Sequence, residues 1–583
     1  MRRRAAGEFA KRVAHVIELE TDVLIVGAGG AGMYAALEAA KGSASVILAD
    51  RSLIGRGGGT VMAMMTVAAA IGQQTPDSPA NHLADTLAAG YGLCDEKLSA
   101  VLCEEGPERI LEMDSWHVGW ARENGHIKQA HAPGHDRPRC VYVDFLSTGP
   151  AVSKTLRHQM QSVPAIRRIG DLLIVDIALE DGVACGATAV HMQTGETVTI
   201  AAKAVVIATG GLTRLYRRNS ASLNMGGDGY ALALRAGAQL IDMEFVQFFP
   251  IGHLAPRLVG LDPIMWDPFR YKLGGKLLNG QMQEFEQNYA VSDGRNDGTY
   301  VLTRDLATYA ILKEVEAGRG SPAGGAYLSF RHVPEAELRR NFGPVIDTLA
   351  RNGIDLTKQP IEVSPIAHYH MGGVKVDTRF ETRVPHLFAA GEAVGGANGA
   401  TRLSGNAITE ALVFGARAGK SAAAAARTAN KQCWTQRASL PAIDLLARRT
   451  TTQAANPAAL IVDLQALMTD KVGPFRTEAR LNEALAGIDR IALASGPDPM
   501  SSGEPSDAML VDWLDLRNMT LVAKSVCLPA LARHESRGAH QREEFPGMDP
   551  RFQFNQLVEL RDGKLALSTN KARQTPELAS TTA

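Results

Sequence analysis

The chain has 583 residues, with 61 lysines and arginines against 62 aspartates and glutamates. This length allows several domains, and the balanced charge excludes the basic field of a nucleic-acid binder. The six cysteines show no C-x-x-C pair or metal-ligand spacing, which predicts reduced thiols, no metal site and no iron–sulfur cluster in this chain. Charged residues follow the arginines at 2–4 and argue against an export signal. No apolar run reaches the ~18 residues of a transmembrane helix, so we expect a cytoplasmic protein.

Residues 21–50 carry the strongest local pattern. An apolar run precedes Gly27, Gly29 and Gly32, which have the spacing G-x-G-x-x-G, and a helix-forming stretch and a second apolar run then lead to Asp50. In such a strand–turn–helix–strand unit, the glycines allow a tight turn and close approach to a pyrophosphate, which the helix N-terminus binds. Asp50 is placed to accept from both hydroxyls of a ribose without a 2′-phosphate. The unit predicts dinucleotide binding and leaves FAD and NAD open.

The next 160 positions continue the α/β pattern. Glycine density over 55–59 predicts backbone against a ligand or another segment, with a flexible loop as the alternative. Residues 79–125 are predicted to be helical, and residues 131–139 form a predicted loop near the active site. Metal binding by His131 and His135 in that loop lacks a third ligand. The following predicted elements are a helix from Thr148 and strands over 172–178, 182–191 and 198–211.

The second half of the chain predicts an insertion and a return to the first domain. Residues 255–360 are rich in proline, glycine and polar loops, whereas apolar α/β character resumes at Val363. The segment F-A-A-G-E-A-V-G-G from Phe388 is a second glycine-rich approach to a cofactor. Two such segments in an interrupted domain suit an elongated FAD better than a transient NAD. Residues 430–583 are predicted to be mostly helical.

Seven motifs stand in one order across residues 20 to 550. They are GAGGAG at Gly27, ATGG at Ala208, GGDGYALALRAGA at Gly226, HYHMGG at His368, AAGEAVGG at Ala389, RLSGNAITEALVFGARAG at Arg402 and ALARHESRGAH at Ala530. In these motifs the chain resembles the flavoprotein subunits of succinate dehydrogenase and fumarate reductase, whose relatives include L-aspartate oxidase and the adenylylsulfate reductase α subunit.

The resemblance implies an α/β fold with a Rossmann-like FAD-binding domain at 20–230 and 363–428. An inserted α+β capping domain is expected at 231–362 and a helical C-terminal domain at 430–567. The cap of such enzymes closes over the isoalloxazine and excludes water.

The resemblance also implies a set of cofactor contacts. Glu392 matches the acid that holds the ribityl chain. The amides at Asn406 and Ala407 match a helix start that faces the flavin pyrimidine. The full expected set is Gly27, Gly29, Gly30, Gly32, Asp50, Arg51, Ser52, Gly58, Gly59, Thr60, Thr209, Gly210, Asp228, Gly391, Glu392, Arg402, Asn406 and Ala407.

Three positions depart from the family pattern. Members with covalent FAD carry a histidine in an R-S-H-T segment, where this chain has Gly59, so we expect non-covalent FAD. Dicarboxylate members hold one carboxylate with a histidine in Q-F-H-P-T-G, where this chain has Phe249. The family's proton-transferring arginine aligns with Tyr309, and a tyrosine can donate a proton but cannot anchor a carboxylate as a guanidinium does. His368 and Arg402 match the pair that binds the other carboxylate.

These departures predict an FAD-dependent oxidoreductase whose small anionic substrate is not succinate or fumarate. Hydride would pass between flavin N5 and the substrate, Arg402 and His368 would bind the anion, and Tyr309 or His370 would transfer the proton. Ordinary packing is the alternative for Phe249 and Tyr309. Alternative functions are a genuine fumarate reductase, succinate dehydrogenase or L-aspartate oxidase, or an electron-transfer protein with an iron–sulfur partner. A homo-oligomer is left open.

Overall fold

The computed structural model divides the chain into two compact units. The first joins residues up to 215, 221–246 and 369 onward, and the second joins 216–220 with 247–368. Among the described residues, no helix is long and apolar enough to cross a membrane. The described residues are 16–144, 146–256, 258, 264–266, 270, 273–289, 304–429, 435–451 and 455–571.

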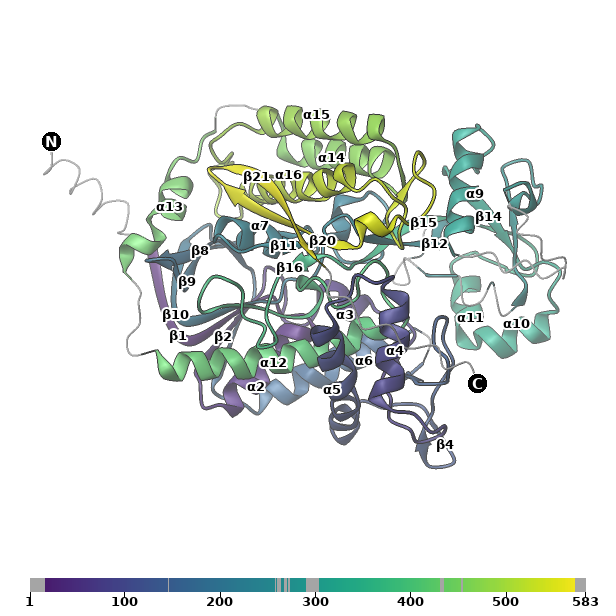
Figure 1. Ribbon diagram of the computed structural model, residues 1–583, viewed down its shortest axis with the longest axis horizontal. Helices are drawn as coiled ribbons and strands as arrows, with labels where there is room; N and C mark the ends of the chain where they lie inside the picture. Colours follow the sequence, from purple (N-terminus) through teal and green to yellow (C-terminus); the bar gives the residue numbers. More distant parts are fainter. Residues whose placement is uncertain are drawn as a thin grey trace, which may run out of the picture. The chain divides into compact units, whose positions relative to one another are not determined.

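A seven-stranded mixed sheet lies at the centre of the first unit (Figure 1). Its middle strand β1 (Val16–Val26) pairs in parallel with β2 (Val46–Ala49) and β10 (Thr197–Ile207). The inner half of β1 is at most 5% exposed, as expected for a strand covered on both faces. The remaining strands are β7 (Ile166–Ile169) beside β2, β17 (Leu387–Ala389) and β9 (Val183–His191) beside β10, and β8 (Leu172–Glu180) beside β9.

Helices α2 (Gly30–Lys41) and α12 (Asn406–Thr428) lie side by side against this sheet (Figure 1). A Cβ on Gly415 would lie 2.5 Å from the carbonyl oxygen of Ala31, so only glycine allows this backbone contact. The predicted helical stretch 79–125 contains α4 (Pro79–Ala89) and α5 (Glu96–Ser115), but its last residues are not helical and include a short strand. The helix predicted from Thr148 is α6 (Thr148–Gln161), and a further helix is α7 (Asp228–Arg235). Shorter elements are α3 (Gly58–Met62), β3 (Val67–Ala68), β4 (Arg122–Glu123), β5 (His126–Ile127) and β6 (Cys140–Val141).

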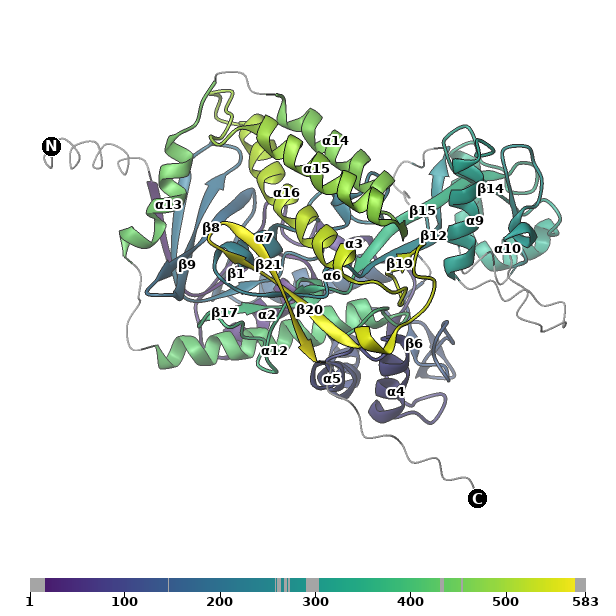
Figure 2. The same ribbon diagram turned by 45° about the horizontal axis from the view of Figure 1, so that its top comes forward.

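The C-terminal region is helical as predicted, and it also contains a hairpin that we did not predict. Helices α14 (Pro457–Lys471), α15 (Glu478–Ser495) and α16 (Ala508–Ala532) pack against one another (Figure 2). Strands β20 (Phe554–Arg561) and β21 (Lys564–Lys571) form the hairpin. The sheet is completed by β11 (Leu240–Ile241) and β16 (Gly373–Val374), and two short strands, β18 (Phe475–Arg476) and β19 (Gln541–Arg542), pair separately.

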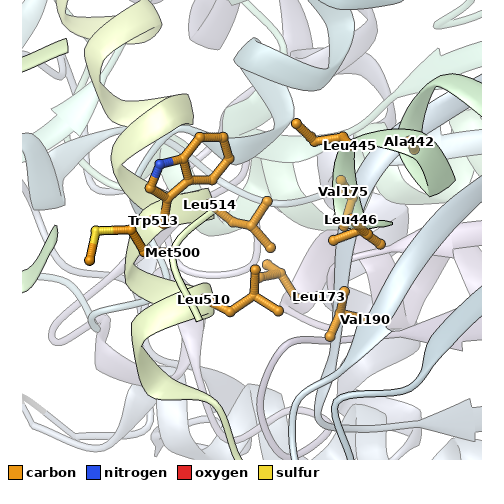
Figure 3. Packing of buried hydrophobic residues seen from close by; sticks show 10 residues of the cluster. All are labelled: Leu173, Val175, Val190, Ala442, Leu445, Leu446, Met500, Leu510, Trp513 and Leu514. Carbon is orange, nitrogen blue, oxygen red and sulfur yellow. The ribbon is translucent and has the colours of Figure 1, made fainter. Parts of the chain in front are cut away.

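Helix α16 is anchored on the central sheet by an apolar cluster (Figure 3). The cluster joins α16 to β8, β9 and α13 (Gln436–Ala447). Burying one large aliphatic side chain stabilises a fold by about 1.5–3 kcal/mol, so this contact fixes the C-terminal helices on the first unit. The members, all at most 7% exposed, are Leu173, Val175, Val190, Ala442, Leu445, Leu446, Met500, Leu510, Trp513 and Leu514.

The second unit is an α+β domain, in the class expected for the cap. Its sheet has the order β12 (Val246–Ala255), β15 (Ile361–His370), β14 (Ala326–Ser329) and β13 (Lys276–Leu278). Its helices are α9 (Arg304–Glu316), α10 (Glu335–Phe342) and α11 (Pro344–Arg351). The unit begins at 247 rather than at the predicted 231, because α7 and β11 pack within the first unit.

A buried ion network joins the end of β2 to α7 and α16. Both terminal nitrogens of Arg51 donate to the Asp515 carboxylate, over 2.7 and 2.8 Å, and one also donates to Asp228 over 3.0 Å. Arg214 donates to Asp515 over 2.5 Å, and Asn518 donates to Asp228 over 3.1 Å. Burial opposes ionisation of Asp515, but the charges of Arg51 and Arg214 outweigh it and lower the pKa of this carboxyl.

Substituting Asp515→Asn should destabilise the first unit by about 3–5 kcal/mol, because Arg214 loses its paired carboxylate and Arg51 keeps only Asp228. Thermal unfolding at neutral pH measures the loss. Asp512→Asn, one turn away on the same helix, is the matched control. Burial and the charge of Asp515 raise the pKa of Asp512, so its neutralisation should leave the melting temperature unchanged or higher. Equal destabilisation by both variants would contradict the role of the network.

Candidate functional site

The glycine turn after β1 has the geometry that its spacing predicts. Gly27 has φ +101°, and a Cβ there would lie 2.5 Å from the carbonyl oxygen of Ala208. A Cβ on Gly32 would lie 1.8 Å from the carbonyl oxygen of Gly27, so only glycine lets α2 approach the turn. At Gly29 the nearest described atom to a Cβ is Thr60 Oγ1, at 3.9 Å. The surface of Gly29 is therefore open to a ligand.

Helix α2 starts at this turn without a side-chain cap. Its N-cap residue is Gly29, and the N–H of Gly30 donates to Thr60 Oγ1 over 3.0 Å. The first turn of any helix has N–H groups without intrahelical partners, and the helix dipole favours an anion there. This end of α2 is thus suited to a pyrophosphate, and the contacts of Gly30 and Thr60 with the cofactor stay predictions.

Asp50 is fixed at the end of β2 by three hydrogen bonds. The N–H of Ala28 donates to Oδ2 over 2.6 Å, and the N–H and hydroxyl of Ser52 both donate to Oδ1 over 2.7 Å. A carboxylate has about four lone-pair sites, so Asp50 can still accept from a ribose hydroxyl. Asn224 donates to the Ser52 hydroxyl over 2.8 Å and holds this group in place.

Most predicted cofactor contacts are partly exposed residues inside otherwise buried segments. The residues on either side of Gly27, Gly29, Glu392 and Ala407 are buried, whereas these four retain accessible surface. Residues with this pattern of exposure can contact a bound molecule. The same partial exposure is found for Asp50, Ser52, Gly58, Gly59, Thr60, Thr209 and Gly210.

Arg51 and Asp228 have protein partners for their side chains. Both belong to the ion network with Asp515, and their contacts with the cofactor stay predictions. Gly391 has φ +63°, and a Cβ there would lie 2.6 Å from the Cβ of Ala31, so this glycine permits the second cofactor segment to approach α2.

Glu392 belongs to the second glycine segment, and its carboxyl group lies next to Gly211 of the A-T-G-G turn. Its Oε1 accepts from the N–H of His370 over 3.1 Å. A Cβ on Gly211 would lie 2.3 Å from Oε1, and a Cβ on Gly59 would lie 3.6 Å from Oε2. Burial, with added repulsion from Glu410, raises the pKa of Glu392 to about 8. In its protonated form this acid can donate a hydrogen bond to a ligand hydroxyl.

The start of α12 is held from behind by a buried histidine. The Asn406 amide donates to Thr86 Oγ1 over 3.2 Å, and its oxygen accepts from His82 Nε2 over 2.8 Å. Burial lowers the pKa of His82 to about 4, so the ring is neutral with its proton on Nε2. Gly405 has φ +84° and turns the chain into the helix. The sequence offered no signal for His82, which contacts Asn406 across 324 positions.

The predicted loop at 131–139 supports the same segment. His131 is exposed, whereas His135 and Arg139 are buried, and His135 Nε2 donates to the carbonyl of Ser404 over 2.7 Å. Arg139 donates to His135 Nδ1 over 3.3 Å, which fixes the neutral tautomer. Among the described residues, no group of three or more His, Cys, Asp or Glu is arranged to hold a metal. Arg139 is paired with Asp77, Asp85 and Asp136.

Helices α2 and α12 run parallel, which places two helix N-termini on the same side. A Cβ on Gly415 would meet the carbonyl oxygen of Ala31 and a Cβ on Gly419 that of Ala35, so the two helices advance together. Asn406 lies nine residues before Gly415, whereas α2 begins one residue before Ala31, so α12 extends about 12 Å further at ~1.5 Å per residue. Two anion-favouring ends at this offset suit a long dinucleotide with a pyrophosphate and a distant ring.

Arg402 is a 7% exposed cation in the loop before α12. Its guanidinium carbon lies 4.4 Å from the centroid of the Tyr369 ring, and Nη1 donates to the carbonyl of Leu403 over 3.1 Å. Stacking and this hydrogen bond fix the plane of the guanidinium.

His370 lies in the core rather than on an accessible surface. It is 0% exposed, and its ring nitrogens contact the Tyr230 hydroxyl over 3.0 Å and the carbonyl of Met243 over 3.1 Å. Burial lowers the pKa of His370 to about 4. This environment disfavours the predicted proton transfer by His370 and leaves Tyr309 as the stronger candidate.

His368 and Tyr309 belong to the second unit. His368 Nδ1 and the Ser220 hydroxyl are 2.8 Å apart, and the Phe249 ring meets the His368 ring edge-on at 5.1 Å between centroids. Tyr309 is half-buried and packs edge-on against Tyr289 at 6.1 Å. Their assembly with Arg402 into one site stays a prediction.

Comparison with known proteins finds matches to two family models, in different regions of the chain. A family model described as an FAD binding domain matches residues 22–408, and one described as the fumarate reductase flavoprotein C-term matches 462–578. The chain is 34% identical to an uncharacterized FAD-dependent oxidoreductase of Methanocaldococcus jannaschii, covering 93% of this chain and 96% of that protein. It is 33% identical to one of the subunits of the fumarate reductase (CoM/CoB) of Methanothermobacter marburgensis, covering 92% and 97%. An L-aspartate oxidase of Streptomyces coelicolor is 31% identical, with 91% and 90% covered.

Solved structures show the same similarity. Mycobacterium smegmatis Sdh1 in complex with UQ1 superposes with a TM-score of 0.87 at 32% identity, covering 96% of this chain and 95% of that one. The E. coli quinol fumarate reductase gives 0.86 at 30% identity, covering 96% and 98%. The predicted resemblance, fold class and FAD cofactor are confirmed. The chain is an FAD-dependent oxidoreductase that belongs to the fumarate reductase and succinate dehydrogenase flavoprotein family.

Proposed function

We propose that this flavoprotein transfers hydride between flavin N5 and a small substrate with one anionic group and an apolar or aromatic remainder. The contact between Phe249 and His368 carries the proposal. Phe249, at the position of the second carboxylate-binding histidine of the family, is 8% exposed and packs against His368. A phenyl ring cannot hydrogen-bond a carboxylate, and desolvating a second carboxylate beside it costs free energy. This wall favours an apolar group where a dicarboxylate would place its second charge.

Arg402 and His368 are proposed to bind the single anionic group. A guanidinium presents its donors in a rigid plane that matches a carboxylate, and stacking on Tyr369 fixes that plane in advance. The hydrogen bond with Ser220 orients the His368 ring in the same way. Pre-organised donors lose little entropy when the anion binds.

Tyr309 is proposed to hold the proton that accompanies hydride transfer. Bound FAD supplies the hydride acceptor or donor, so the chain must supply orientation, exclusion of water and the proton. The Tyr309 hydroxyl can donate a proton, whereas both His370 nitrogens already have partners in the core.

Two other functions are supported by specific observations. The 33% identity with a fumarate reductase protein over almost the whole chain favours a genuine fumarate reductase or a close variant. The match of the C-terminal region to the fumarate reductase flavoprotein model favours an electron-transfer role with an iron–sulfur partner. The first alternative requires turnover of fumarate or succinate, and the second requires no small-molecule turnover by the isolated chain.

A carboxylate screen should separate these functions. We expect succinate to bleach the oxidised flavin, and fumarate to reoxidise the reduced flavin, about 100-fold more slowly than the best monoanionic substrate, measured anaerobically at 450 nm. Phe249→His should raise the fumarate rate about tenfold, because it restores a polar partner beside His368. Phe248→His is the matched control, since Phe248 packs on Tyr216, and should not raise it. Rapid fumarate turnover by the unmodified protein would overturn the proposal.

Substituting Arg402→Ala should lower kcat/KM for the substrate found in that screen by about 100-fold or more, because it removes charge-assisted hydrogen bonds to the anion. Arg402→Lys should recover part of the loss, since it restores the charge without the planar fork. The absorbance ratio at 450 and 280 nm checks that FAD remains bound. Undiminished turnover by the alanine variant would exclude Arg402 as the anion site.

The FAD should be bound without a covalent link, because Gly59 provides no nucleophile at the position of the family's attachment histidine. Acid precipitation should release all of the flavin into the supernatant, and the denatured polypeptide should show no flavin fluorescence on a gel. Fluorescence that migrates with the polypeptide would contradict this prediction.

A further inference from the structure

A buried carboxylate contacts the aromatic residue on which Arg402 stacks and has no role in the function proposed above. The Tyr369 ring, on which Arg402 stacks, carries a hydroxyl that donates to Glu410 Oε2 over 2.7 Å. The Asn398 amide donates to the same oxygen over 2.6 Å. Glu410 is 0% exposed and Asn398 is 2% exposed, so the group is sealed from solvent.

The two oxygens of Glu410 have different environments. Oε2 accepts two hydrogen bonds, whereas Oε1 is buried with no hydrogen-bond partner among the described residues. A buried ionised carboxylate is costly unless it is paired, while hydrogen-bond donors and a nearby cation favour ionisation. The orphan oxygen is a site for a proton, and the donors at Oε2 stabilise the ionised form.

Charged and titratable groups from several elements surround Glu410 and influence its pKa. They are Glu392 from the second glycine segment, Tyr230 from α7, Tyr369 from β15 and Arg402 from the loop before α12. Burial raises the pKa of Glu410 to about 7, and the donors Tyr369 and Asn398 and the charge of Arg402 limit the rise.

We propose that Glu410 is a positioning residue that holds Arg402 in place through Tyr369 and serves as its titratable counter-charge. Ionised Glu410 then weakens the binding of an anion at Arg402, and protonated Glu410 strengthens it. The inference rests on the proposed function, which assigns anion binding to Arg402. Glu410 itself touches neither substrate nor flavin in this assignment and acts through Tyr369 and through its charge.

The sign follows from the local charge. Ionised Glu410 adds a negative charge close to Arg402 and repels an incoming carboxylate. Protonation of Glu410 removes that repulsion. Anion affinity should therefore fall as the pH rises through about 7. By reciprocity, a tenfold fall in affinity means that a bound anion raises the pKa of Glu410 by about one unit.

The test measures the dissociation constant of a carboxylate by its effect on the flavin spectrum of the full-length, FAD-loaded protein. Acetate, phenylacetate, malonate and succinate are the probes, from pH 5.5 to 8.5 at constant ionic strength. In the unmodified protein the dissociation constant should rise about tenfold through pH 7. Glu410→Gln keeps an oxygen that accepts from Tyr369 and Asn398 but removes the charge, so the rise centred near pH 7 should be lost. Glu392 also interacts with Arg402 and its pKa is raised to about 8, so any remaining rise should lie above that midpoint.

Tyr369→Phe supplies a second, independent readout. It keeps the ring beneath Arg402 but removes a donor that stabilises ionised Glu410, so the midpoint of the pH dependence should move upward. Glu105→Gln is the matched control, because Glu105 pairs with Arg417 of α12, away from this group. FAD content and melting temperature check the fold of each variant.

Each outcome decides one of the two proposals. A Glu410→Gln protein that retains the normal pH dependence overturns the role of Glu410 and leaves anion binding at Arg402 intact. If the dissociation constant of the unmodified protein does not change with pH, the role of Glu410 is likewise overturned and anion binding at Arg402 is unaffected. If Glu410→Gln does not fold, an unshifted midpoint in Tyr369→Phe overturns the role. If none of the probes changes the flavin spectrum of the unmodified protein, the anion site itself fails, and the role of Glu410 fails with it.

Discussion

The close backbone contact between the two parallel helices α2 and α12 is the constraint on which the cofactor site depends. A side chain at Gly415 or Gly419 would collide with the carbonyl oxygens of Ala31 or Ala35, so this packing requires glycine. Because the helices are parallel, their positive ends open on the same side of the sheet. Gly27 and Gly32 then bring the turn after β1 up to the first of these ends. One steric arrangement thus places two anion-favouring helix ends on the same side of the sheet.

Features fixed by local sequence could be predicted, and those fixed by distant contacts could not. The glycine spacing around Gly27 and the apolar run of β1 specify their own geometry, and the first unit contains both as expected. His82 and Asp515 became important only when folding placed them beside Asn406 and Arg51. No periodicity or motif marks such long-range partners.

The hairpin of β20 and β21 was not predicted, although the sequence contains a local signal for it. Asp562 and Gly563 form its two-residue turn, both with positive φ, between the paired residues Arg561 and Lys564. An Asp-Gly pair flanked by alternating residues is a strong hairpin signal. The helical pattern of the preceding residues concealed it. For the candidate site the limit was burial. His368 and His370 are two residues apart on β15 and share a face of the strand, but His370 is enclosed by Tyr230 and the carbonyl of Met243, and no sequence pattern marks these distant partners.

Sequence similarity establishes different things at the cofactor end and at the proposed substrate end of the site. At the cofactor end, the glycines have little freedom to vary, because backbone geometry sets their identity. At the proposed substrate end, the contacts involve a few side chains. Phe249 packs edge-on against His368, and the Tyr369 ring on which Arg402 stacks donates its hydroxyl hydrogen bond to Glu410. Identity of 33% over 92% of the chain with a fumarate reductase protein shows the family, whereas the substrate must be established from the side chains around the proposed anion site.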